Sequence, residues 1–284
     1  MDFLTALRSG SPVYAAELRP PRAELESAEG MDAWIDTYHA VKRLTRAGTY
    51  VMLTDSAVGA EEEDNLRHLV TNLGHDVPRS RIVPFMTTKH SREYCLSYAE
   101  RAQQSGFPAL VVLGGDKAVG TPRCVEHAWQ LREMLRTHTP SLALGGWANP
   151  HANAERQVSY LLDTNFTAEF YLTQVVSHHD LPAVTAFLSA ARQRASHLPG
   201  VFGVFYYRSA NPKTLAILKS FLPVPVDGLT REFSAGDTPD DICARTLRAL
   251  ADAGAQHFYI SNLPVLRAQT VLDSILRKAG LGAQ

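Results

Sequence analysis

The chain has 284 residues and a formal net charge of -1 at pH 7, from 28 basic and 29 acidic side chains that are mixed along its length. This length is near that of one (β/α)8 barrel, roughly 250 residues, and is enough for a large hydrophobic core. The mixed charge excludes a broad basic surface for nucleic acid and a polybasic face for lipid, so neither nucleic acid nor a membrane is expected as a partner.

Export and membrane insertion are not predicted. Residues 1–10 contain no long apolar core, and no later segment approaches the roughly 20 apolar residues that cross a bilayer. The three cysteines, Cys95, Cys124 and Cys243, are scattered and form no CxxC pair, which argues against a disulfide framework and a zinc knuckle. We therefore expect a cytoplasmic protein with free, mostly packed thiols. The oligomeric state stays open, and a monomer is compatible with the sequence.

Strand and helix patterns alternate along the chain. Short apolar runs predict strands at Val13–Leu18, Tyr50–Thr54, Ile82–Met86, Ala109–Leu113, Leu142–Gly146, Phe170–Thr173, Val201–Tyr206 and His257–Ile260. Segments with helical periodicity lie at Met31–Arg46, Glu61–Leu73, Ser91–Ser105, Val125–Leu135, Asn153–Asp163, Leu181–Ser196, Pro212–Phe221, Pro239–Ala253 and Val265–Lys278. The proline- and glycine-containing stretch from Val224 to Pro239 predicts a lid or rim loop.

Cap residues support several helix boundaries. Helix starts are indicated by Ser91, by Thr121 before Pro122 and by Asn211 before Pro212. Helix ends are indicated by Gly48, Gly74, Gly106 and Gly254.

The alternation predicts an α/β fold with a parallel sheet. A doubly wound sheet would normally carry a glycine-rich phosphate turn after its first strand, and here that strand runs into Pro20 and Pro21. We therefore predict a single (β/α)8 TIM barrel, with right-handed crossovers, that covers residues 1–284 as one domain.

Three predicted strands carry a polar side chain at or near their carboxyl ends. Glu17 lies within the first strand, Asp116 follows the fourth strand and two glycines, and Gln174 follows the sixth. Because the carboxyl ends of barrel strands meet at one rim, these side chains should line one pocket.

Each of the three has a chemical and a structural interpretation. A carboxylate on an apolar strand should have a raised pKa, as a general acid needs, but an ion pair of Glu17 with Arg19 or Arg22 explains it equally well. The glycines before Asp116 permit close approach of a ligand, although a turn or helix-capping aspartate is the stronger interpretation of that segment alone. Gln174 offers a donor and an acceptor for the edge of a heterocycle, and amides at such positions are equally often structural.

Together these segments resemble the methylenetetrahydrofolate reductase family over nearly the whole chain. The similar segments are AELRPP at Ala16–Pro21, VMLTDSA at Val51–Ala57, LGGD at Leu113–Asp116, LTQ at Leu172–Gln174 and HFYISN at His257–Asn262. Each motif is weak alone, but their order and spacing agree with the family. The resemblance implies a (β/α)8 barrel that reduces 5,10-methylenetetrahydrofolate to 5-methyltetrahydrofolate.

The resemblance also implies roles for individual residues. Glu17 is then the general acid that protonates N10, which opens the five-membered ring to a 5-iminium cation. Asp116 contacts the pterin and favours the cation electrostatically, and Gln174 holds the folate. Thr54 and Tyr206 are the further candidates for substrate binding.

The sequence departs from the family where most members contact FAD. Phe85-Met86-Thr87 stands where the family has a histidine followed by Leu-Thr, and Trp147–His151 is a reduced form of a longer loop. Gly114 replaces an arginine, and Asp163 falls where the family has a lysine, so a pyrophosphate would lose cationic contacts. We therefore predict that FAD is absent and that NADH passes its hydride directly to the folate in a ternary complex.

The nicotinamide cofactor is expected in the mouth of the barrel, because the chain has no GxGxxG turn. Phe85, Thr87, Trp147 and His151 are the candidate cofactor contacts. For any single aromatic residue, packing in the core or rim is the stronger interpretation. The sequence does not distinguish NADH from NADPH.

No metal site is predicted. His178 and His179 precede Asp180, but no further ligand follows at a convincing spacing. The acidic run 61–64 opens a predicted helix, where negative charge stabilises the positive end of the helix dipole.

Three other functions are compatible with the sequence. They are the same reaction with FAD held by substitute contacts, a barrel that binds a reduced folate without reducing it, and a corrinoid-linked methyltransferase. The last normally needs a cobalamin domain, which this sequence lacks. The joint presence of Glu17, Asp116 and Gln174 favours an enzyme, since a pure binding protein has little need of a proton donor.

Overall fold

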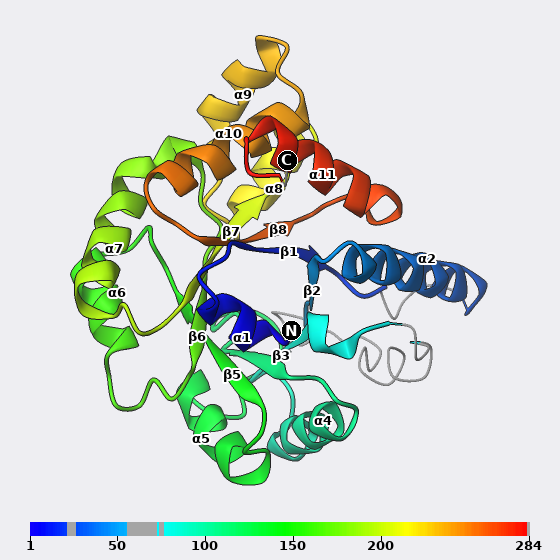
Figure 1. Cartoon of the computed structure of the whole chain (residues 1–284), viewed down its shortest axis with the longest axis vertical. Helices are drawn as coiled ribbons and strands as arrows, with labels where there is room; N and C mark the ends of the chain where they lie inside the picture. The colour runs from blue at the N-terminus through cyan, green and yellow to red at the C-terminus, as the bar shows by residue number, and fades with distance from the viewer. Residues whose placement is uncertain (22–26, 56–72, 74–76, 283–284) are drawn as a thin grey trace.

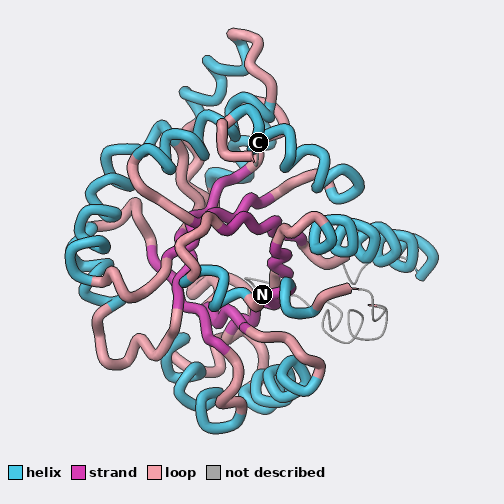
Figure 2. The backbone as a smooth tube through the Cα atoms, in the orientation of Figure 1, coloured by secondary structure: helices cyan, strands magenta, loops and turns pink. Residues whose placement is uncertain are grey.

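The computed structural model describes residues 1–21, 27–55, 73 and 77–282. Parallel strands in this part of the chain close into a barrel, in the order β1 to β8, with helices around it (Figures 1 and 2). The strands are β1 (Val13–Leu18), β2 (Tyr50–Leu53), β3 (Ile82–Thr87), β4 (Ala109–Leu113), β5 (Ala143–Ala148), β6 (Phe170–Thr173), β7 (Gly200–Phe205) and β8 (His257–Ser261). The predicted (β/α)8 barrel is therefore confirmed.

Apart from α9, the described outer helices overlap the predicted helical segments. They are α2 (Ser27–Arg46), α4 (Arg92–Gln104), α5 (Ala128–His138), α6 (Ala154–Leu161), α7 (Leu181–Arg194), α8 (Pro212–Lys219), α9 (Val226–Ser234), α10 (Pro239–Asp252) and α11 (Ala268–Lys278). The predicted helix Glu61–Leu73 lies outside the described residues except for Leu73, as do its acidic first turn and Gly74.

Two of the three predicted helix starts are confirmed. The Ser91 hydroxyl accepts a hydrogen bond from the Tyr94 amide at 3.1 Å, and Asn211 Oδ1 accepts one from the Thr214 amide at 3.1 Å. Thr121 does not begin a helix, because α5 starts only at Ala128. The glycines predicted at helix ends have positive φ in the described residues, at Gly48 (93°), Gly106 (81°) and Gly254 (99°).

Helix α1 (Phe3–Arg8) closes the amino-terminal end of the barrel. The ring of Phe3 is fully buried and lies 5.2 Å from the rings of Tyr50 and Phe170, which begin β2 and β6. The Tyr50 hydroxyl donates to the carbonyl of Met1 at 3.0 Å. In Figures 1 and 2 this helix lies across the ring of strands. The sequence analysis missed it because six residues are too few to show a helical period.

A buried histidine joins the ends of β1 and β8 beneath this helix. His257 is 3% exposed, and its Nδ1 accepts a hydrogen bond from the Val13 amide at 3.2 Å. A ring nitrogen that accepts is unprotonated, so the proton lies on Nε2 and the ring is neutral. Burial lowers the pKa of His257 from 6.5 to about 4.

We expect His257 to make the fold less stable in acid. Between pH 6.5 and about 4 the unfolded chain takes up a proton at this side chain and the folded chain does not, so the free energy of unfolding falls as the pH falls. The full effect is about 3 kcal/mol. Urea titrations across this range should show a smaller slope against pH for His257→Asn than for the wild type. Identical slopes would contradict the assignment.

The barrel interior and the space beneath the helices form separate apolar layers. Alternate residues of each strand point inward, for example Ala15, Met52 and Phe85, and their neighbours pack against the helices. Glycines make room for the large inward rings: a Cβ on Gly203 would lie 2.4 Å from the hydroxyl of Tyr259. The next inward residue along each strand lies at the open, carboxyl-terminal end, which we call the mouth.

The β7–β8 connection is better ordered than the predicted rim loop. It contains α9, whose Leu229 is fully buried in a small core with Tyr207, Leu215, Val224 and Ile242. The loop prediction was therefore wrong over Val226–Ser234. The proline and glycine suggested a loop, but Pro225 precedes the first turn of this short amphipathic helix, and Gly228 lies where it packs closely.

Two further predictions concern the membrane and the cysteines. No helix within the described ranges has both the length and the apolar character needed to cross a bilayer. All three cysteines are free, with Cys95 and Cys243 buried and Cys124 partly buried, as expected.

Candidate active site at the carboxyl ends of the strands

Glu17 is the acid of the mouth. Its Oε1 accepts a hydrogen bond from the Ser261 hydroxyl at 3.0 Å, so the ends of β1 and β8 are linked. The side chain keeps partial contact with solvent, yet the surrounding protein raises its pKa from 4.5 to about 7, and the Ser261 hydrogen bond offsets only part of this. The partner is thus a hydroxyl and not the guanidinium of Arg19, and Arg22 lies outside the described residues.

Asp116 forms a turn after β4. Its Oδ1 accepts hydrogen bonds from the amides of Ala118 (2.8 Å) and Val119 (3.2 Å), and the preceding Gly115 has a φ of 69°. The structural interpretation of this aspartate is therefore present in the fold. These bonds use one carboxylate oxygen, and the other is available to a ligand in the mouth.

The loop that carries Asp116 is held firmly against β3. The Thr88 hydroxyl donates to the Gly114 carbonyl at 2.9 Å, and the Lys89 ammonium donates to the carbonyls of Val119 and Thr121, each at 2.7 Å. Lys89 is only 3% exposed, so these carbonyls take the place of the water molecules that would solvate its ammonium group. Asp116 therefore has a fixed position at the mouth.

The same loop places a cation beside Gly114. A Cβ on Gly114 would lie 2.9 Å from Cζ of Arg123, whose guanidinium donates to the carbonyls of Gly115 and Glu126. The Nε of Arg123 is buried and has no hydrogen-bond partner among the described residues. Arg123 therefore places a guanidinium where the family's arginine is replaced by Gly114.

Asp163 lies at the other end of the barrel. It follows α6 in the connection to β6, and helix-to-strand connections of this fold lie at the amino-terminal end. Its Oδ1 accepts a hydrogen bond from the Asn165 amide at 2.8 Å. The carboxylate is thus away from the mouth, and its charge does not bear on a ligand held there.

The ends of β5 and β6 bring three predicted residues together. The backbone N–H of Gln174 donates to the Ala148 carbonyl at 2.9 Å. The side-chain Oε1 of Gln174 accepts from the backbone N–H of Val175 at 3.0 Å, which leaves the side-chain NH2 group for a ligand. Nε2 of His151 lies 2.9 Å from the Val175 carbonyl, to which a protonated Nε2 donates. Trp147, on the inward side of β5 by strand alternation, is 37% exposed.

Of the other predicted residues, Tyr206 and Phe85 lie away from the mouth, whereas strand alternation puts Thr54 and Thr87 at the mouth end of β2 and β3. The Tyr206 hydroxyl donates to Asp240 on α10 at 2.8 Å, so this ring lies outside the barrel and does not join the others. Phe85 is 5% exposed and belongs to the inner core. The Thr54 amide donates to the Leu18 carbonyl at 3.1 Å, which puts Thr54 beside the strand of Glu17. Thr87 is 1% exposed and bonds to Asp55.

The sequence analysis missed an acid and a histidine at the ends of β2 and β3. Asp55 Oδ2 accepts from the amide and the hydroxyl of Thr87, at 2.6 and 3.0 Å, and lies 2.8 Å from Nε2 of His90. The His90 ring is 4.6 Å from that of Tyr94. Asp55 lies two residues after β2, much as Asp116 lies three residues after β4, so the sequence contained the signal.

Comparisons with known proteins show the fold. No family model matches the sequence, and no curated protein matches it. A similar solved structure is described as an uncharacterized protein from Clostridium thermocellum that binds two copies of 5-methyl-5,6,7,8-tetrahydrofolic acid. The TM-score is 0.70 at 16% sequence identity, and the match covers 98% of each chain. The chain therefore shares its barrel over its full length with a protein that binds a reduced folate.

Proposed function

We propose that the protein binds a reduced folate in the mouth and reduces 5,10-methylenetetrahydrofolate to 5-methyltetrahydrofolate with NADH. The observation that carries this proposal is Glu17, a carboxyl group at the mouth whose pKa of about 7 lets it hold a proton at neutral pH. Folate binding is further supported by the shared fold, since the similar Clostridium protein binds the product of this reaction.

The reaction has a proton step and a hydride step. Glu17 gives its proton to N10, the bond from N10 to the bridging carbon breaks, and a 5-iminium cation forms. The Asp116 carboxylate stabilises this cation. The hydride that converts the exocyclic methylene carbon to the methyl group would be supplied by NADH, which would leave as NAD+. The amide of Gln174 holds the pterin edge, and the exposed face of Trp147 offers a surface for a flat ring.

Arg123 is the residue that fits a dinucleotide. Its guanidinium lies against Gly114 after β4, where its positive charge could pair with a pyrophosphate. This guanidinium would suit NADH and FAD equally. Direct hydride transfer without FAD is therefore proposed on the sequence departures at Phe85–Thr87 and Trp147–His151 alone.

Anaerobic NADH oxidation is the test. Protein freed of flavin, and checked by its absorption spectrum, is mixed with NADH and methylenetetrahydrofolate, and loss of NADH absorbance is followed. Turnover without FAD is expected. Turnover only after FAD is added would keep the reductase and overturn direct transfer. Absence of turnover under both conditions would overturn the reductase.

A second function, reduced-folate binding without turnover, is favoured by one observation. The similar Clostridium protein is described only by its binding of 5-methyltetrahydrofolate. Tight calorimetric binding of this folate by a protein that never oxidises NADH would establish that function instead.

We expect Gln174→Ala to weaken folate binding selectively. Loss of about one to two hydrogen bonds should raise the Kd for 5-methyltetrahydrofolate roughly tenfold, because each contributes about 1 kcal/mol, and the Kd for NADH should stay nearly constant. Isothermal titration of each ligand measures both constants.

Arg123→Gln is the matched variant for the other ligand. It removes the guanidinium but keeps a polar side chain on the same loop, and it should raise the Kd for NADH about tenfold or more while folate binding is retained. If Gln174→Ala weakened NADH binding and Arg123→Gln weakened folate binding, the assignment of the two ligands to these residues would have to be exchanged.

A further inference from the structure

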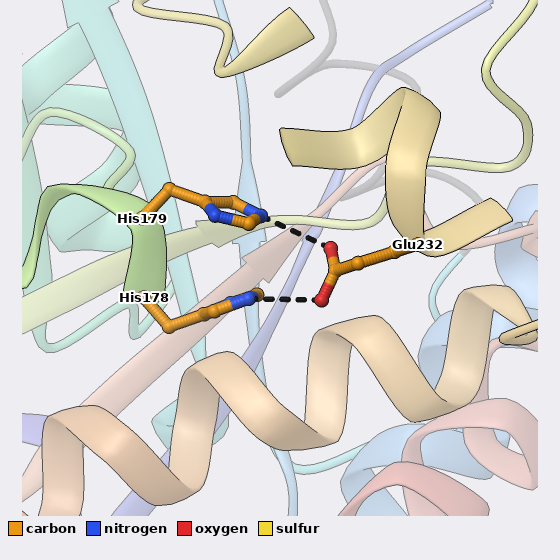
Figure 3. A group of neighbouring side chains, drawn as sticks. All are labelled: His178, His179 and Glu232. Carbon is orange, nitrogen blue, oxygen red and sulfur yellow. Dashed lines mark hydrogen bonds and ion pairs between the residues drawn. The ribbon is translucent and has the colours of Figure 1, made fainter. Parts of the chain in front are cut away.

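Two histidines and a glutamate converge outside the mouth (Figure 3). His178 and His179 lie on the 3-10 turn His178–Asp180 after β6, and Glu232 lies on α9. Nε2 of His178 is 3.0 Å from Oε1 of Glu232, and Nε2 of His179 is 3.0 Å from Oε2. The side chains are 14%, 22% and 11% exposed. Sequence spacing did not reveal the third member, because Glu232 is distant along the chain.

Thr246 contacts the nitrogen of His178 that points away from Glu232. The Thr246 hydroxyl donates to the Ile242 carbonyl at 3.2 Å, one helical turn earlier, and its oxygen lies 2.8 Å from Nδ1 of His178. When the hydroxyl proton goes to the Ile242 carbonyl, the Thr246 oxygen accepts from Nδ1–H, and this is the arrangement that a metal on Nε2 requires. Nε2 of a neutral His178 then presents a lone pair to a carboxylate oxygen at 3.0 Å. Two acceptors at this distance repel each other unless a cation lies between them.

A metal ion bound to Nε2 would serve as that cation and would be held by side chains from both α9 and the turn after β6.

The donor set fits zinc. Many Zn2+ sites have two imidazole nitrogens and a carboxylate as ligands and keep a fourth position open. Their bond lengths of about 2.0–2.1 Å place neighbouring ligand atoms roughly 3.3 Å apart. The three candidate ligand atoms already lie within 4.8 Å of one another. Thr246 is hydrogen-bonded to Nδ1 of His178, the ring nitrogen that would not bind the metal. Such a hydrogen bond on the other nitrogen is common in metal-bound histidines and fixes the orientation of the ring.

The surroundings also match a bound dication. Arg245 contacts Glu232 and pairs with Asp237 at 3.0 Å, so its charge is balanced by a second carboxylate. Gly228 lets α9 come close: a Cβ there would lie 2.5 Å from Cε1 of His179. Helix α9 and the turn after β6 are therefore brought to bonding distance by the fold itself.

We propose that His178, His179 and Glu232 bind a divalent transition-metal ion, with Zn2+ as the best match, and that this ion fastens α9 to the segment after β6. The site is separate from the mouth and does not depend on the proposed reaction. Since the segment after β6 begins with Gln174, the metal would also hold the folate-binding strand end in place.

Cobalt and zinc titrations of the full chain test the proposal. After chelator treatment and dialysis, Co2+ should bind at one equivalent with the visible absorption of a tetrahedral site, and Zn2+ should displace it. Thermal unfolding should move to higher temperature with either metal. His178→Gln and Glu232→Gln, which keep polar side chains of similar size, should each weaken binding at least tenfold.

A matched pair elsewhere on the surface is the control. His138 and Glu100 lie 3.9 Å apart and are each 48% exposed, so His138→Gln should leave metal binding unchanged. Folding of every variant is checked by circular dichroism. Absence of stoichiometric binding by the folded wild type, or binding that the His178 and Glu232 variants retain, would overturn the site. In that case 15N spectra should show both histidines protonated on Nε2.

Discussion

Glu17→Gln should lower kcat for methylenetetrahydrofolate reduction by about 10²–10⁴-fold at pH 7, with little change in folate Kd. Glutamine has almost the same shape, and its amide oxygen can still accept the Ser261 hydrogen bond, but it has no acidic proton to give to N10. Single-turnover NADH oxidation and folate titration separate the two quantities. A variant that turns over near the wild-type rate would show that another group protonates the folate.

The pH dependence identifies the same proton. The wild-type kcat should fall about tenfold per pH unit above pH 7, because Glu17 loses its proton near a pKa of about 7. Ser261→Ala serves as the control: it removes the hydrogen bond that lowers this pKa, so the alkaline limb should move to higher pH. An alkaline limb that stays in place in both Glu17→Gln and Ser261→Ala would exclude Glu17 as its source.

The raised pKa of Glu17 makes the folded chain less stable as the pH rises, whereas the lowered pKa of His257 makes it less stable as the pH falls. Glu17 holds its proton more tightly in the folded chain, with a pKa of about 7, than in the unfolded chain, with 4.5. The free energy of unfolding contributed by this group therefore falls as the pH rises from 4.5 to 7. Glu17→Gln should have a higher Tm than the wild type at pH 8 and no such advantage at pH 4. A stability loss at pH 8 would mean that the carboxylate is favourably paired in the fold.

Gly203→Ala should destabilise the barrel by about 1–3 kcal/mol or more. The added Cβ would lie 2.4 Å from Cζ and the hydroxyl of Tyr259, far inside van der Waals contact. Tyr259 is 2% exposed, and its hydroxyl donates to the Thr173 carbonyl at 2.6 Å, so the ring cannot retreat without losing this bond and its packing. Urea unfolding gives the change in free energy.

Gly282→Ala is the control for this substitution. A Cβ at Gly282 would meet its nearest neighbour at 3.6 Å, an ordinary contact, so the expected change is within about 0.5 kcal/mol. If both variants unfolded at the same urea concentration, Tyr259 would have to be free to move.

The architecture was predictable wherever a segment was long enough to show its period. Strands such as Ala109–Leu113 and helices such as α10 carry strong apolar patterns, and their alternation, with Pro20 and Pro21 in place of a glycine-rich turn, predicts a barrel. Helix α1 could not be predicted, because its role depends on Phe3 meeting Tyr50 and Phe170 across the barrel. Helix α9 was hidden for a similar reason, since it is stabilised by a small core drawn from several segments.

The site was predictable one strand at a time. Glu17 and Gln174 were identified because a polar residue on an apolar strand is conspicuous, and both lie at the mouth. Tyr206 was misplaced because strand alternation turns Val201 and Gly203 inward, and therefore Phe205 next, while Tyr206 faces α10. Pairings between loops, such as Asp55 with His90 or Arg123 with Gly114, have no sequence period and appear only in the fold.

Helix α1 has a kinetic consequence for any two-substrate reaction in this barrel. Within the described ranges, Phe3 packs between Tyr50 and Phe170 and α1 covers the amino-terminal end of the barrel axis, so ligands are expected to enter from the mouth. Two ligands that share such an entrance must arrive in sequence, and the one that lies deeper must arrive first and depart last. Steady-state kinetics should therefore be ordered, and the product that lies nearer the solvent should inhibit without competing with the deeper substrate.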